Sequence, residues 1–141
     1  MIGQTISHYN VLEKLGEGGM GRVYRAIDRT LGRHVAVKVL RSSDPFEASR
    51  FRGEAEMIAL LSHPNIVTIY EIGQDPVRTP GAPDSDPVHY ISMELVSGKT
   101  LAALIHEEKA DLRTLLGYLA QAAEGLSKAH AAGIVHRDLK P

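Results

Sequence analysis

The chain has 141 residues, of which 43% are hydrophobic and 23% are charged, so it is long enough to bury a sizeable core and too apolar for a disordered segment. Sixteen basic and seventeen acidic residues leave a formal net charge of -1, which excludes a bulk electrostatic attraction to nucleic acid or to a membrane surface. The sequence contains no cysteine, which excludes a disulfide framework and thiolate chemistry.

The N-terminal segment lacks the charged stretch and apolar run of a signal peptide, and no apolar run is long enough to cross a bilayer. We therefore expect a cytoplasmic location and no membrane segment within this chain. Membrane anchoring through sequence downstream of the chain stays open.

Five segments predict β-strands. Residues 9–15, 22–28 and 34–40 are short, rich in β-forming side chains and separated by glycine-containing turns, a pattern typical of consecutive antiparallel strands. Residues 66–72 and 88–95 have the same composition and predict two further strands.

A helix is predicted between the third and fourth of these strands. Asp44 suits the N-cap, Pro45 the first helical position and Glu47 the third, where its side chain can reach back to the cap amide. We expect the helix to end at Leu61, because Pro64 disfavours the helical conformation in the residue before it.

Residues 73–87 contain four prolines and two glycines. Such a segment buries too little apolar surface to offset its ordering entropy, so we expect a mobile hairpin loop without a function.

Beyond residue 97 the pattern is helical. Residues 100–107 predict a short helix and residues 111–132 a long one that ends at Gly133. The long helix carries apolar residues at helical spacing: Leu112, Leu115, Leu116, Leu119, Ala122, Ala123, Leu126 and Ala129. The expected class is α+β, with a five-stranded antiparallel sheet and one helix in residues 1–96, followed by helices in residues 97–141.

Gly16, Gly18 and Gly21 form a G-x-G-x-x-G pattern. A dinucleotide fold would need a helix directly after the glycines, but the residues that follow are strand-like. The glycines therefore join two strands, where they allow backbone amides to approach a phosphate closely. Taken alone, they leave a plain hairpin turn and a phosphate site equally open.

Lys38 lies in an otherwise apolar strand, and a buried ammonium without a partner is costly. The functional interpretation is a fixed positive charge that binds a polyphosphate. Two structural alternatives are a lysine on an edge strand that extends to solvent and a plain ion pair in the core. Glu54 falls on the apolar face of the predicted helix, between Phe51 and Ile58, so we expect it to point inward and to pair with Lys38.

The last six residues are His136–Pro141, and the first four of them, His-Arg-Asp-Leu, open the H-R-D-L-x-x-x-N catalytic loop. Together with Gly16–Val23, Val35–Lys38, Glu54 and Met93–Val96, this ordered set resembles the eukaryotic-type protein kinases, and especially their bacterial Ser/Thr branch. The resemblance covers nearly the whole chain. It implies a kinase small lobe in residues 1–96, and a hinge and the start of a large lobe in residues 97–141.

The resemblance also implies roles for individual residues. Asp138 would accept or orient the proton of the substrate hydroxyl, and Lys140 would stabilise charge on the transferred phosphoryl group. His136 would be architectural, and Arg137 would pair with a phosphorylated activation-loop residue. The implied ATP-binding residues are Leu15, Gly16, Glu17, Gly18, Gly19, Met20, Gly21, Arg22, Val23, Ala36, Lys38, Glu54, Met93, Glu94 and Val96.

Within that set, the glycines would cover the phosphates, and Lys38, oriented by Glu54, would bind the α- and β-phosphates. Leu15, Val23 and Ala36 would enclose the adenine. Met93 would lie behind the adenine, and the backbone of Glu94 and Val96 would bond the purine edge.

The implied partners are ATP, Mg²⁺ and a protein substrate with Ser or Thr. We expect no nucleic-acid partner. The remaining histidines show no shared ligand spacing, so we expect no metal site among them. The family's metal ligands are expected beyond residue 141, and we expect this stretch alone to be inactive. Two alternatives are a non-catalytic, pseudokinase-like module that binds nucleotide or a partner, and a gene remnant.

Overall fold

The computed structural model describes residues 1–18, 21–40, 44–136 and 139. The chain divides into two compact units, one made of residues 1–59 and 68–95 and the other of residues 60–67 and 96–141. The sequence suggested a division after residue 96 and placed residues 60–67 in the first unit.

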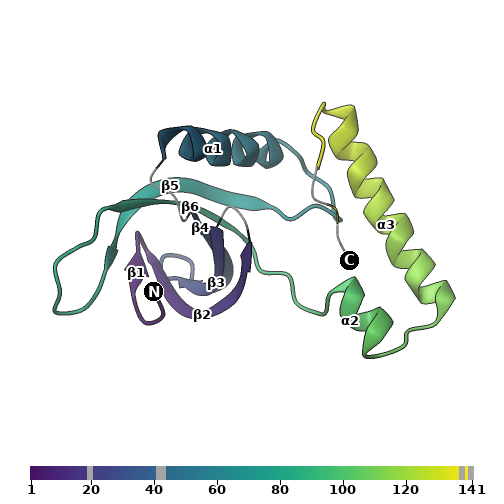
Figure 1. Cartoon of the computed structure of the whole chain (residues 1–141), viewed down its shortest axis with the longest axis horizontal. Helices are drawn as coiled ribbons and strands as arrows, with labels where there is room; N and C mark the ends of the chain where they lie inside the picture. The colour runs from purple at the N-terminus through teal and green to yellow at the C-terminus, as the bar shows by residue number, and fades with distance from the viewer. Residues whose placement is uncertain (19–20, 41–43, 137–138, 140–141) are drawn as a thin grey trace. The chain divides into compact units, whose positions relative to one another are not determined.

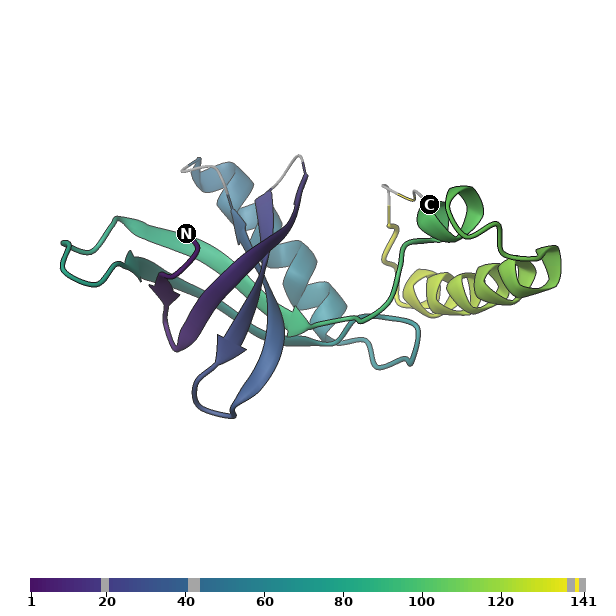
Figure 2. The ribbon, with the colours of Figure 1, turned by 90° about the horizontal axis from the view of Figure 1, so that it is seen from below.

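The first unit is a closed antiparallel barrel with one helix on its outer face (Figures 1 and 2). Around the barrel the strands follow the order β1-β2-β3-β4-β6-β5. Its elements are β1 (Thr5–Ile6), β2 (Tyr9–Gly18), β3 (Gly21–Asp28), β4 (Arg33–Leu40), α1 (Pro45–Ala59), β5 (Ile69–Arg78) and β6 (Pro87–Glu94).

The two-residue strand β1 closes the barrel. Thr5 pairs with Asn10 of β2 and with Arg78 of β5, so β1 bridges the two strands that would otherwise be sheet edges. The sequence predicted five strands and missed this sixth one, because two residues are too short to show a periodicity. The α+β class itself is confirmed.

The expected loop over residues 73–87 is shorter in the structure. β5 continues to Arg78 and pairs with β6 as far as Pro76 opposite Pro87, which leaves residues 79–86 as the connection. At Gly73 a Cβ atom would lie 2.5 Å from the Tyr90 ring, so the glycine makes room for the aromatic side chain of the neighbouring strand. The prediction of a loop was wrong for residues 73–78, because their strand pairing depends on β6.

The side chains of β4 alternate between two separate cores, as the period of two in a strand requires. Val35, Val37 and Val39 point into the barrel, where they pack with side chains that include Tyr24 and Tyr90. Leu40, on the opposite face, packs with Ile91 of β6 and with the buried face of α1, which consists of Ala48, Phe51 and Ala55.

The N-terminus of α1 has the predicted cap. Asp44 Oδ1 accepts a hydrogen bond from Phe46 N at 2.9 Å, and the Asp44 carbonyl accepts one from Ala48 N at 2.9 Å. A side-chain acceptor at this position satisfies a helix donor that has no partner within the helix.

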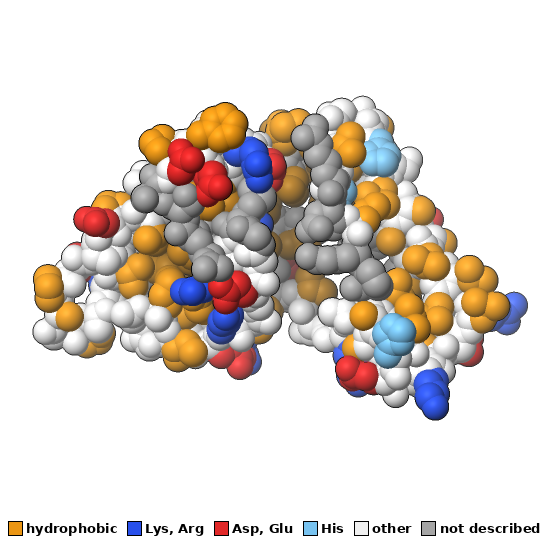
Figure 3. Space-filling view, in the orientation of Figure 1, with side chains coloured by type: hydrophobic (Ala, Val, Ile, Leu, Met, Phe, Trp, Pro, Cys, Tyr) orange, Lys and Arg blue, Asp and Glu red, His pale blue; other side chains and the backbone are white. Residues whose placement is uncertain are grey.

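The second unit contains α2 (Leu101–His106) and α3 (Leu112–Ala131). Asp111 caps α3 through a 3.0 Å bond from Thr114 N, and Gly133 follows the helix with a φ of 79°, as expected for a helix C-terminus. Leu112, Leu116 and Leu119 are exposed, and hydrophobic side chains follow α3 in Figure 3.

Residues 60–67 belong to this second unit because they pack on α3. Asn65 Nδ2 donates a 2.9 Å hydrogen bond to the carbonyl of Gln121. A Cβ atom at Gly125 would lie 3.1 Å from the Asn65 carbonyl oxygen, so the glycine allows the segment to approach the helix closely. No helix among the described residues is long and apolar enough to span a membrane.

Candidate nucleotide site

One row of directly paired residues crosses the outer face of the barrel. Gly16 of β2 lies opposite Val23 of β3, Val23 lies opposite Lys38 of β4, and Lys38 lies opposite Ile91 of β6. Directly opposite side chains in an antiparallel sheet have Cβ atoms about 5 Å apart. The register therefore brings the first glycine of the motif, Val23 and Lys38 into one continuous line.

Two further rows flank this line on the same face. Ala36, two residues before Lys38, lies opposite Met93, and Gly21 lies opposite both Gly18 and Leu40. Ala36 is only 7% exposed, and Met93 is partly buried against the core beneath α1. The structure thus assembles Gly16, Gly18 and Gly21 with the predicted residues of β3, β4 and β6.

The three glycines of the motif have different surroundings. A Cβ atom at Gly16 or Gly18 would meet no atom of the described residues within 4 Å, whereas at Gly21 it would lie 2.3 Å from the Val39 carbonyl oxygen. Packing therefore explains the glycine at position 21 and leaves the other two unexplained. Open space above the backbone of Gly16 and Gly18 fits a phosphate group, which needs close approach to the N–H groups.

Lys38 points toward α1. Its Nζ atom lies 5.6 Å from the centroid of the Phe51 ring, and its side chain is partly buried. A charge in this position is less screened than one in bulk water. The lysine is therefore neither fully exposed nor enclosed in the core, which suits a residue that binds an anionic ligand.

The prediction that Glu54 points inward was wrong for this structure. The Glu54 side chain is 55% exposed, and its Oε1 atom lies 3.6 Å from Arg50 Nε, one turn earlier on α1. Glu54 and Lys38, both among the described residues, form no ion pair with each other. The helix buries Ala48, Phe51 and Ala55 instead, and this rotation leaves Glu54 on the flank of the helix.

Other members of the predicted set are less enclosed. Leu15 is about half exposed and lies where the pairing of β2 with β3 shifts register. Glu94 ends β6, with its N–H donating to the Thr68 carbonyl at 2.9 Å and its carboxylate accepting from Thr68 N at 3.2 Å. Val96 belongs to the second unit and is 65% exposed.

Several predicted residues lie outside the described residues. These are Gly19 and Met20 of the glycine motif, and Arg137, Asp138, Lys140 and Pro141 of the catalytic-loop motif. Their roles stay predictions from sequence. In the described part of the chain, no group of three or more His, Asp and Glu side chains could hold a metal ion.

The β2–β3 hairpin carries a charged cluster that the sequence analysis did not identify. Glu17 lies between two cations, with Lys14 Nζ in contact with Oε2 and Arg22 Nε 3.3 Å from Oε1. The hydrogen bond from Lys14, supported by Arg22, lowers the pKa of Glu17 to about 2. Glu17 and Arg22 were predicted as members of the glycine loop, but nothing in the linear sequence connected Lys14 to them.

A partly buried polar network was also missed. Glu71 accepts hydrogen bonds from the hydroxyls of Tyr9 at 2.6 Å and Tyr90 at 2.7 Å, and the Tyr9 hydroxyl also contacts Ser92 Oγ at 2.9 Å. Burial and the bond to Glu71 raise the pKa of Tyr9, and burial raises that of Tyr90 to about 12. The network joins β2, β5 and β6 and stabilises the barrel on which Lys38 lies.

Comparison with known proteins identifies the family. Residues 9–141 match the model of the protein kinase domain. The chain belongs to the protein kinase family. The kinase resemblance inferred from the glycine motif, Lys38 and the His136–Leu139 segment is thereby confirmed.

The kinase chain is similar to curated bacterial proteins. It is 41% identical to the serine/threonine-protein kinase PknA of Mycobacterium tuberculosis over 99% of this chain and 32% of the relative. It is 39% identical to the serine/threonine-protein kinase PrkC of Bacillus subtilis, over the whole chain and 21% of the relative. A probable serine/threonine-protein kinase of Streptomyces coelicolor is 45% identical over 94% of this chain and 20% of its own length.

The chain therefore spans about a third or less of the length of these relatives. Protein kinases as a family use ATP and a divalent metal ion and phosphorylate proteins.

Proposed function

We propose that this protein is an ATP-dependent serine/threonine kinase, which transfers the γ-phosphoryl group of ATP to Ser or Thr hydroxyls of protein substrates. The observation that carries the proposal is the row formed by Gly16, Val23 and Lys38. It combines open glycine backbone, an apolar contact surface and a partly buried ammonium group on one face of the barrel. The family match over residues 9–141 supports the same activity.

In this proposal the described residues bind and orient the nucleotide. Val23 and Ala36 contact the adenine, and Met93 limits the depth of the adenine site. The backbone N–H groups near Gly16 and Gly18 approach the phosphates from above. Lys38 pairs with the α- and β-phosphates, where its low exposure strengthens the attraction.

The remaining roles rest on the sequence motifs. The backbone of Glu94 and Val96 bonds the purine edge, Asp138 orients the substrate hydroxyl, and Lys140 stabilises charge on the transferred group. Mg²⁺, when bound, would neutralise part of the negative charge on the phosphate groups.

Lys38 and Glu54 must pair in a catalytically competent kinase. In this structure Glu54 lies beside Arg50, so we expect the Lys38–Glu54 pair to form only after α1 rotates or Glu54 adopts another rotamer. Phe51, three residues before Glu54, already lies near Lys38, so Lys38 faces the helix that carries Glu54.

The test compares Lys38→Met with Lys128→Met in the full-length protein. Lys128 is exposed on α3 and provides a control for the loss of one lysine charge. We expect Lys38→Met to lower kcat/KM for phosphorylation of a generic Ser/Thr protein substrate by at least about 100-fold, since it removes phosphate binding in the transition state. Lys128→Met should retain the wild-type value, and both variants should unfold at the wild-type temperature.

Two outcomes would contradict this assignment. Retention of activity by Lys38→Met would remove Lys38 from the mechanism. ATP binding by the wild-type protein without any phosphoryl transfer would replace the kinase with a non-catalytic nucleotide-binding module.

A further inference from the structure

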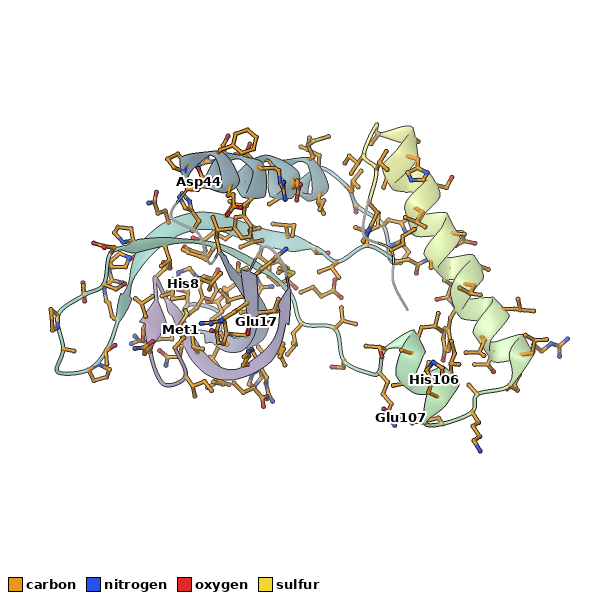
Figure 4. The ribbon with its side chains drawn as sticks, viewed as in Figure 1. Met1, His8, Glu17, Asp44, His106 and Glu107 are labelled. Atoms are coloured by element: carbon orange, nitrogen blue, oxygen red, sulfur yellow. The ribbon has the colours of Figure 1, made fainter. Side chains whose placement is uncertain are left out.

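The hairpin formed by β2 and β3 holds three charged side chains in contact: Lys14, Glu17 and Arg22, here named the hairpin cluster. Glu17 lies directly opposite Arg22 in the strand ladder, and its two carboxylate oxygens contact different cations. Figure 4 labels Glu17 on this part of the barrel. The Glu17 carboxylate therefore links Lys14 on its own strand to Arg22 on β3.

The cluster depends on a bulge in β2. Residues three apart in a regular strand point to opposite faces of the sheet, so Lys14 and Glu17 should not meet. The pairing of β2 with β3 shifts register between Lys14 and Gly16. An extra residue in a strand reverses the alternation beyond it, and Leu15 at this shift brings Lys14 and Glu17 to the same side.

The hairpin cluster lies on the side of the sheet opposite to the row formed by Gly16, Val23 and Lys38. Val23 shares its row with Lys38, and its neighbour Arg22 therefore points the other way. Lys14 is paired with Tyr24, whose side chain points into the barrel. The hairpin cluster thus lies behind the backbone of Gly16 and Gly18, where its cations cannot serve as direct phosphate ligands.

We propose that Glu17 is a positioning residue for the phosphate groups of ATP. By holding Lys14 and Arg22 together on the back of the hairpin, it keeps β2 and β3 paired up to the glycine turn, so that the N–H groups near Gly16 and Gly18 are already arranged for phosphate. This inference rests on the proposed kinase function and adds a residue whose effect is transmitted through backbone order.

The charge of Glu17 alone predicts the opposite effect. A carboxylate near a polyanionic ligand repels it, so removal of the charge should strengthen ATP binding if Glu17 had no positioning role. Loss of the hairpin cluster should instead weaken ATP binding, because the hairpin must then be ordered upon binding. The sign of the change in ATP affinity therefore separates the two explanations.

The pKa of Glu17, lowered to about 2 by the hydrogen bond from Lys14 and then by Arg22, keeps the carboxylate ionised at any assay pH near neutrality. The hairpin cluster is therefore present under ordinary assay conditions.

The experiment compares Glu17→Gln with Glu13→Gln in the full-length protein. Glu13 is a matched control, since it lies on the same strand and pairs across the same ladder with Arg25, at 2.9 Å from Nη1. Both substitutions remove one negative charge and one cross-strand ion pair. Only Glu17→Gln removes the pairing next to the glycines.

Four quantities are measured: KM for ATP, kcat at saturating ATP, the dissociation constant of adenosine by competition, and the melting temperature. We expect Glu17→Gln to raise KM for ATP about 2- to 5-fold, the range that one or two exposed ion pairs can supply. The value of kcat, the adenosine affinity and the melting temperature should stay at wild-type values. Glu13→Gln should change none of the four quantities.

An unchanged or lowered KM in Glu17→Gln would overturn the inference, as would an equal rise in Glu13→Gln. A matching loss of adenosine affinity would also overturn it, because adenosine has no phosphates to position. Failure of the wild-type protein to bind ATP would instead remove the proposed function on which the inference rests.

Discussion

Replacement of Gly21 by alanine should destabilise the barrel even though the residue belongs to a nucleotide-binding motif. The added Cβ atom would lie 2.3 Å from the Val39 carbonyl oxygen and 3.1 Å from its carbonyl carbon. Side-chain carbons essentially never approach another heavy atom to less than 3.0 Å, so β3 and β4 must separate locally by close to 1 Å, a shift set by van der Waals contact. Since the obstructing atom belongs to the paired backbone of β4, no rotamer change can relieve the overlap.

The cost of such overpacking is about 1 to 3 kcal/mol. For a folded domain of about 150 to 250 residues, this corresponds to a decrease in melting temperature of roughly 2 to 12 °C. Gly18→Ala is the matched control, because a Cβ atom there meets no atom of the described part of the chain within 4 Å. This substitution should change the melting temperature by about 1 °C or less.

Thermal unfolding and ATP titration of both variants in the full-length protein provide the measurement. We expect Gly21→Ala to unfold earlier, and Gly18→Ala to unfold at the wild-type temperature but to bind ATP more weakly, since its methyl group occupies the phosphate approach. Equal melting temperatures for Gly21→Ala and the wild-type protein would refute the packing argument.

Two further predictions concern charged residues away from the glycine motif. Arg50→Gln should raise kinase activity about 2-fold, because it releases Glu54 to pair with Lys38 and an exposed i,i+4 pair contributes about that much. Arg52→Gln breaks the equivalent 2.7 Å pair with Glu56 and should leave the activity unchanged. Equal rates for the two variants would contradict a competition of Arg50 and Lys38 for Glu54. Asp28→Asn should lower the free energy of unfolding by about 1 kcal/mol near neutral pH. Burial opposes ionisation of the Asp28 carboxyl group, but the backbone N–H groups of Leu31 and Thr30 donate hydrogen bonds to it and outweigh burial, so that its pKa is lowered. A carboxylate whose pKa is lowered by folding stabilises the folded state above its ordinary pKa, and this stabilisation is lost as the pH falls. In denaturant titrations, the difference in free energy of unfolding between wild type and Asp28→Asn should therefore shrink on acidification through pH 4. A difference independent of pH would contradict a stabilising role for the ionised carboxylate.

The sequence predicted the strands that form the site because their side-chain patterns are local. The apolar character of residues 34–40 and the glycines on either side of residues 22–28 are enough to predict paired strands. The order of Gly16, Gly18, Lys38 and the His136–Leu139 segment is specific to one family, and the family match confirmed that assignment.

Other features could not be predicted because they depend on contacts between distant residues. β1 is a strand only because β2 and β5 leave room for it. Residues 73–78 extend β5 because β6 provides a partner. Neither segment contains a periodicity long enough to be recognised in the sequence alone.

The orientation of Glu54 shows the same limit. Its position between Phe51 and Ile58 is compatible with an inward direction, but the rotation of α1 is decided by how Phe51, Ala48 and Ala55 fill the space above β4 and β6. A shift of one residue around a helix is about 100°, so a side chain at the edge of the apolar face can be buried or exposed with little change in the pattern.

The amino-acid sequence by itself thus determined the family and the approximate strands, and it predicted the residue types of the proposed phosphate site, since these depend on local composition and motif order. The tertiary structure decided which residues act together. Strand register placed Gly16, Val23 and Lys38 in one row and Gly21 against Val39, and a bulge brought Lys14 to Glu17. The physical reason is that register, bulges and helix rotation minimise the energy of the whole packed unit, which no short segment encodes alone.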